Sequence, residues 1–70
     1  MTIDIHGYEV KMIGSYIQIT DHNIRCPKIV VARGATADRA IARLELLRAM
    51  GDDETLRIWL ATVYCNGRWS

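Results

Sequence analysis

Residues 36–50, with the sequence TADRAIARLELLRAM, form the clearest helical pattern in the chain, and they determine the fold that we expect. Their apolar residues recur at helical spacing and share one side: Ala37, Ala40, Ile41, Leu44 and Leu47. Thr36 suits the N-cap and Asp38 the positively charged first turn. Gly51 is a suitable C-terminal stop. The apolar side of this helix should pack against a sheet.

Two alternating runs at the start of the chain predict β-structure. Ile3 and Ile5 alternate with a polar residue, and so do the apolar residues of 8–12, but the two runs fall on opposite parity. One extra residue at His6-Gly7, as a bulge or a sharp bend, would place both sets on one face of a sheet.

Two further strands are expected before the helix. Gly14-Ser15 is a short turn signal, and residues 16–20 after it have strand composition. Residues 21–27, DHNIRCP, are rich in turn formers and predict a loop. Residues 28–33, KIVVAR, are β-branched and predict a further strand that Gly34 ends.

The C-terminal segment, DDETLRIWLATVYCNGRWS, matches two patterns. Residues 55–64 are rich in strand-favouring types, and Asn66-Gly67 is the strongest hairpin signal in the chain. We therefore expect a strand and hairpin here. The alternative is a second helix packed on the first, with Asp52 as its N-cap and Asn66-Gly67 as its C-cap.

These elements predict an α+β fold in a single small domain, residues 1–70. A small antiparallel sheet of three to five strands is packed by one main helix at about 36–50, and the C-terminal segment forms a hairpin or a second helix. The chain is 50% hydrophobic and 24% charged, which argues against intrinsic disorder. No apolar stretch is long enough for a membrane span, so no membrane partner is expected. The N-terminus lacks signal-peptide features, which favours a cytoplasmic location.

The residue inventory argues against catalysis. The soft metal ligands are His6, His22, Cys26 and Cys65, and they do not form the two tight pairs of a structural zinc site. In a reducing location we expect the two cysteines to be packed thiols without a bridge. No glycine-rich phosphate loop or nucleophile signature is present. We therefore expect no enzyme activity, no catalytic residues, no metal site and no cofactor.

One side of the 36–50 helix combines arginine with exposed apolar residues. With Arg39 placed at 0° and about 100° per residue, Arg43 lies at about 40°, Met50 at about 20° and Leu46 at about 340°, opposite the core side at about 80–200°. Arginine, methionine and leucine in one patch are typical of an interface. Alternatively, the C-terminal segment folds over Leu46 and Met50, or these are isolated exposed apolar residues without a role.

The charge distribution indicates the kind of partner. Residues 1–24 carry a net charge of −2, residues 25–50 carry +4 and residues 51–70 carry −1. We interpret the chain as a small protein-binding module, a regulator or inhibitor of the kind common in phages and mobile elements. It would dock Arg39, Arg43, Leu46 and Met50, with nearby Arg25, Lys28 and Arg33, on an acidic protein surface.

Two other functions use the same surface. The order of three strands and a helix, Tyr8 to Met50, resembles the small sheet-plus-helix arms of phage integrases, which implies nucleic-acid binding. Those arms bind a groove with a basic strand face, whereas the first two strands here offer only Lys11. The chain can also form a homo-oligomer through Leu46 and Met50. A weaker candidate is Trp69 beside Arg68, which either stacks on a partner or closes the core across the hairpin.

Overall fold

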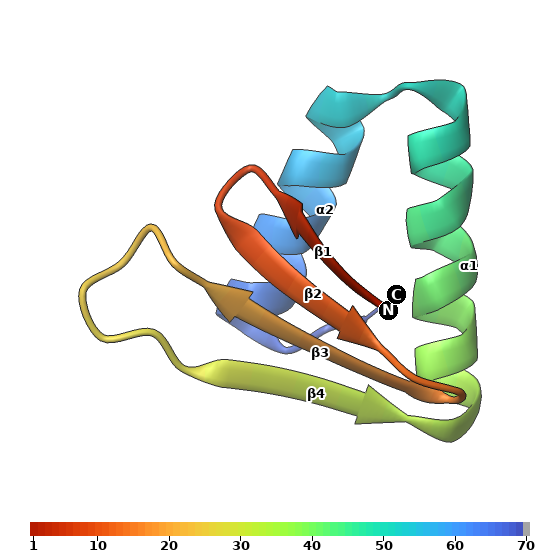
Figure 1. Ribbon diagram of the computed structural model, residues 1–70, viewed down its shortest axis with the longest axis horizontal. Coiled ribbons are helices and arrows are strands. Elements are labelled where there is room, and N and C mark those ends of the chain that lie inside the picture. Colours follow the sequence, from red (N-terminus) through yellow and green to blue (C-terminus); the bar gives the residue numbers. More distant parts are fainter. Residues whose placement is uncertain (70) are drawn as a thin grey trace.

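The computed structural model describes residues 1–69 and shows an antiparallel sheet followed by two helices (Figure 1). The four strands lie in the order β1-β2-β3-β4, so each pairs with its neighbour in sequence. The expected α+β fold is thereby confirmed. The elements are β1 (Thr2–Ile5), β2 (Tyr8–Met12), β3 (Tyr16–Asp21), β4 (Ile29–Arg33), α1 (Gly34–Met50) and α2 (Asp53–Asn66).

The chain reverses direction at His6-Gly7, where the sequence suggested a bulge or a bend within one strand. His6 has φ 52° and Gly7 has φ 83°, and Ile5 pairs directly with Tyr8. Two central residues with positive φ characterise a two-residue hairpin turn whose twist matches that of the strands. Because directly paired residues of an antiparallel ladder point to the same side, the first strand still faces the core, as expected.

The loop after β3 fastens this hairpin turn. The amide N–H of His22 donates to the carbonyl of Gly7 at 2.9 Å, and Nδ2 of Asn23 donates to the carbonyl of His6 at 3.0 Å. The side chain of Asp21 accepts from the backbone N–H of Asn23 at 2.8 Å. These contacts satisfy turn groups that would otherwise depend on water.

Helix α1 begins two residues earlier than the sequence indicated, and Thr36 is not its N-cap. The cap position is Arg33, the last residue of β4, which makes no capping side-chain hydrogen bond. The N–H of Gly34 still donates to the carbonyl of Ser15 at 2.9 Å, so sheet pairing runs directly into the helix. Asp38 consequently lies beyond the first turn. At the other end, Gly51 adopts φ 71° and ends the helix as expected.

Residues 53–66 of the C-terminal segment form a helix, α2. The expected strand and hairpin are therefore wrong, and the helical alternative is correct. Asp52 caps α2 by accepting from the N–H of Thr55 at 3.1 Å, and Gly67 ends it with φ 66°. The helical spacing of its apolar residues outweighed their strand propensity, because one side of the helix can bury all of them. The buried residues of α2 are Leu56, Trp59, Leu60, Val63 and Tyr64.

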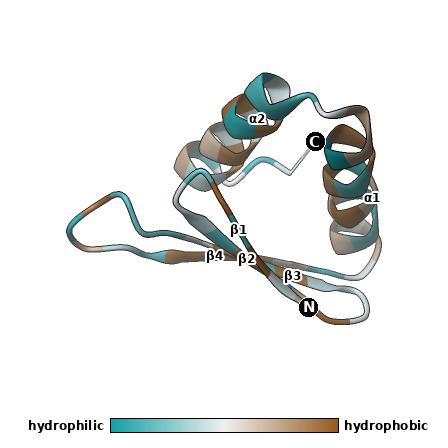
Figure 2. Ribbon diagram, turned by 45° about the horizontal axis from the view of Figure 1, so that its top comes forward, coloured by the Kyte–Doolittle hydropathy of each residue, from teal (hydrophilic) through white to brown (hydrophobic). Residues whose placement is uncertain are grey.

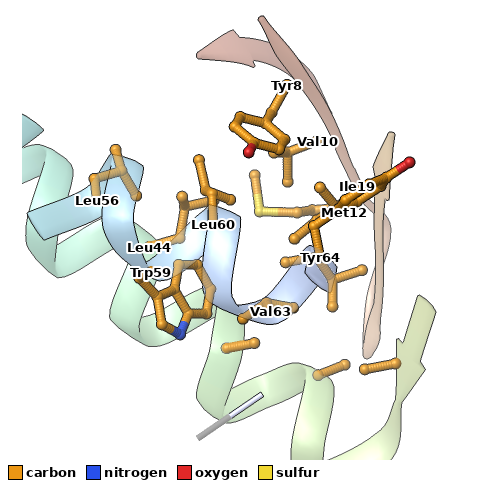
Figure 3. Packing of buried hydrophobic residues seen from close by; sticks show 14 of the residues in the cluster. Tyr8, Val10, Met12, Ile19, Leu44, Leu56, Trp59, Leu60, Val63 and Tyr64 are labelled. Carbon is orange, nitrogen blue, oxygen red and sulfur yellow. The ribbon is translucent and has the colours of Figure 1, made fainter. Parts of the chain in front are cut away.

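Both helices cover the same face of the sheet, so the core is a single layer between sheet and helices (Figure 2). Figure 3 shows side chains from β2, β3, α1 and α2 meeting there. Tyr8 and Tyr64 pack edge to face with ring centroids 6.1 Å apart. Burial raises the pKa of the Tyr8 phenol, and the carboxylate of Asp21 adds to the rise. The largest fully buried side chains are Val10, Ile17, Ile19, Leu44, Leu56, Leu60 and Val63.

Tyr64 attaches the end of α2 to the start of β4. Its phenol oxygen accepts from the backbone N–H of Lys28 at 2.8 Å and donates to the carbonyl of the same residue at 2.8 Å. The Lys28 ammonium lies 5.9 Å from the centre of the Tyr64 ring. One phenol thus satisfies both backbone groups of a residue 36 positions away.

Tyr64→Phe should lower the free energy of unfolding by about 1–3 kcal/mol, because two backbone groups lose their partner. Urea denaturation of the purified chain measures this change. Tyr16→Phe is the matched control, since its hydroxyl bonds Gln18 on the open face of the sheet and its loss should cost about 0.5–1 kcal/mol. Equal losses in the two variants would show that the Tyr64 hydroxyl does not stabilise the junction.

Candidate binding site on helix α1

The side of α1 that faces away from the core carries Arg39, Arg43, Leu46 and Met50, and we call these four residues the outer α1 stripe. All four side chains are exposed, and Leu46 and Met50 retain 59% and 65% of their accessible surface. The opposite side of the helix buries Ala37, Ala40, Leu44 and Leu47. From Arg39 to Met50 the stripe spans about 16 Å along the helix axis.

Up to Trp69, the C-terminal segment does not cover the apolar half of the stripe, Leu46 and Met50. The chain returns from the end of α2 toward α1 (Figure 1). There Gly67 and Trp69 line one hollow together with Arg39 and Arg43. Residues 67 and 69 therefore lie beside the first half of α1, and the side chains of Leu46 and Met50 stay exposed. Trp69 is half-buried and packs partly against the core, although no hairpin is present.

The other three expected site residues lie in two different places. Arg25 is in the exposed loop between β3 and β4, and Lys28 ends this loop at its contact with Tyr64. Arg33 lies at the far end of β4, about 17 Å along the strand, where its guanidinium is 5.5 Å from the centre of the Tyr16 ring. The structure thus joins Arg33 to the start of α1 and places Arg25 and Lys28 at the opposite end of the sheet.

A cavity of about 350 Å³ lies beside the basic half of the stripe, between α1 and the segment after α2. We call it the arginine cavity, and its lining residues are Thr36, Arg39, Arg43, Gly67 and Trp69. The sequence indicated the two arginines but not the cavity, because its second wall depends on α2 ending at Gly67. Asn66-Gly67 predicts the end of α2 if the pair is interpreted as a helix C-cap and not as a hairpin turn.

The β4 edge is a second exposed surface, which the sequence did not indicate. Ile29 and Val31 retain 58% and 41% of their accessible surface. The N–H of Gly34 donates to the carbonyl of Ser15, so these two residues form a hydrogen-bonded pair. Such pairs alternate with non-hydrogen-bonded pairs along an antiparallel ladder. The backbone N–H and C=O groups of Ile29, Val31 and Arg33 therefore point away from β3. No strand of residues 1–69 covers this edge, which leaves it open to a strand from another chain.

The cysteines differ from expectation. Cys26 and Cys65 are both free, as expected, but both are exposed, so the prediction of packed thiols is wrong. Cys26 lies in the exposed β3–β4 loop, and Cys65 lies on the side of α2 away from the core. In the part of the chain that the structure describes, no three histidine, cysteine or acidic side chains gather in a way that could hold a metal ion.

Neither helix in the described residues is long and apolar enough to cross a membrane. Comparison of the chain with protein-family models, curated proteins and solved structures finds no match.

Replacing both Leu46 and Met50 by alanine should change the free energy of unfolding by less than about 0.5 kcal/mol, because exposed side chains contribute little to folding. By contrast, Leu44→Ala on the buried side of the same helix should cost about 2–5 kcal/mol. Thermal or urea denaturation of the two variants measures the difference. A large loss in the double variant would mean that other parts of the protein cover these side chains in solution.

Proposed function

We propose that this protein is a small non-enzymatic binding module that docks the outer α1 stripe on an acidic surface of a partner protein. The observation that supports this most is the exposure of Leu46 and Met50 on a helix whose other side is fully packed. Large apolar side chains next to arginines form the composition that protein interfaces favour. Such a module acts by occupying a surface of its partner, so we propose that it regulates or inhibits that partner.

The charges near the stripe support an acidic partner. Arg39 and Arg43 make no ion pair with any carboxylate of residues 1–69, where the one pair formed is His22 with Glu9 at 3.9 Å. Two guanidinium groups on one side of a helix, without an ion pair in the described part of the chain, attract a carboxylate pair and orient it through forked hydrogen bonds. Arg33 lies just before the first turn of α1 and adds positive charge to this end.

Nucleic-acid binding remains the alternative on the same basic residues. The positions of Arg25 and Lys28 do not strengthen it, since they lie at the other end of the sheet from Arg33 rather than in one continuous basic stripe. Self-association through Leu46 and Met50 is compatible with either function.

The double variant Arg39→Glu with Arg43→Glu should weaken partner binding at least about 100-fold, because attraction to the acidic surface becomes repulsion. The fold should be unaffected, since both side chains are exposed. The partner is first captured from a lysate of the native host, with and without nuclease treatment. Its affinity for each variant is then measured by calorimetry with purified proteins.

The matched control is Arg48→Glu with Arg57→Glu, which makes the same change in net charge at exposed positions outside the stripe. It should bind like the parent chain, within about three-fold. Equal affinities of the two double variants would remove the stripe as the docking site. The nucleic-acid alternative would instead be established if nuclease treatment removed the captured partner and if binding weakened steeply as the salt concentration increased.

A further inference from the structure

The arginine cavity has the size of a small-molecule site. Its volume of about 350 Å³ lies within the range of roughly 300–1,000 Å³ that ligand pockets occupy. At about 30 Å³ per water molecule, this volume corresponds to about twelve waters. One wall is the first half of α1, and the opposite wall is the segment that follows α2. The cavity is partly open to solvent and has room for a charged group together with an attached ring.

The α1 wall provides two positive charges that the described residues leave without a counter-ion. Arg39 and Arg43 are four residues apart, so their side chains are neighbours on the helix surface and repel each other. Neither forms an ion pair within residues 1–69. A ligand with two negative charges would remove this repulsion and accept forked hydrogen bonds from both guanidinium groups. This favours a phosphate dianion over a singly charged carboxylate.

The remaining lining residues favour an organic group attached to that phosphate. Thr36, one turn before Arg39 and two turns before Arg43, also lines the cavity. Gly67 ends α2 in a left-handed conformation and has no side chain, so no side chain at this position fills the cavity. Trp69 is half-buried and offers an aromatic surface, which suits a planar or apolar group better than a bare inorganic ion.

From this arrangement we propose that the arginine cavity binds a phosphate monoester, with the phosphate between Arg39 and Arg43 and the organic group against Trp69. The binding is non-covalent and needs no partner protein, so it can fail or succeed independently of the docking function proposed above.

The test is a titration of the ¹⁵N-labelled chain, followed by the amide signals and the two tryptophan indole N–H signals. The probes are phenyl phosphate, inorganic phosphate and benzoate, all at constant ionic strength. Phenyl phosphate should shift the indole signal of Trp69 and the amides of residues 36–43 and 67 in a saturable way, with a Kd in the millimolar range or below. The signal of Trp59, buried in the core, should stay in place.

Arg39→Gln and Arg43→Gln should each raise the Kd of phenyl phosphate at least about ten-fold, since each removes a charge-assisted contact. Arg48→Gln, an exposed arginine of the same helix outside the cavity, is the matched control and should leave the Kd unchanged. Inorganic phosphate and benzoate should each bind at least about three-fold more weakly, because one lacks the ring and the other the second charge.

Three outcomes would overturn the proposal. The first is the absence of a saturable shift at the cavity, and the second is an equal loss of affinity in the Arg39→Gln and Arg48→Gln variants. The third is binding of inorganic phosphate or benzoate as tight as that of phenyl phosphate, which would show a general attraction of anions to the arginines.

Discussion

Ala37 and Ala40 carry only a methyl group each, and both are almost completely shielded from solvent. These small side chains allow the backbone of α1 to approach β3 and β4 closely, and Leu44 fills the space between α1, α2 and the sheet. Once this side of the helix is fixed, the helical period leaves no choice for the other side. Arg39, Arg43, Leu46 and Met50 must then point outward, whatever their own affinity for water.

The sequence predicted an element correctly wherever one pattern, of spacing or of composition, applied to it alone. The buried side of α1 and the exposed stripe follow from helical spacing, and the structure has them where expected. The strands at 16–20 and 28–33 were predicted from their composition and the turn signals beside them, and their bounds differ from the observed ones by one residue each. His6-Gly7 was harder, because a bulge and a two-residue hairpin produce the same change of parity. They differ in whether the chain reverses, and the pairing of Ile5 with Tyr8 decides this.

The C-terminal segment shows why local preference was insufficient. Ile58, Thr62 and Val63 favour strands individually, but a strand would have buried only alternate residues of this segment. As a helix, α2 buries Leu56, Trp59, Leu60, Val63 and Tyr64 on one side against β3 and α1. The arginine cavity depends on this outcome, because only a helix that ends at Gly67 brings Trp69 back to α1. No pattern within residues 36–50 carries that information.

The two halves of the outer α1 stripe contribute different things to recognition. Burying Leu46 and Met50 against a partner would supply most of the affinity, at about 1.5–3 kcal/mol for each fully buried side chain. Arg39 and Arg43 would mainly determine which partner is attracted and in which orientation, since exposed ion pairs add little binding energy. A phosphate monoester in the arginine cavity would neutralise these two charges and leave Leu46 and Met50 untouched. The acidic partner protein and the phosphate monoester would therefore compete for the two arginines but not for the apolar surface. Occupancy of the cavity would reduce the selectivity for acidic partners more than it reduces the contribution of Leu46 and Met50 to the affinity.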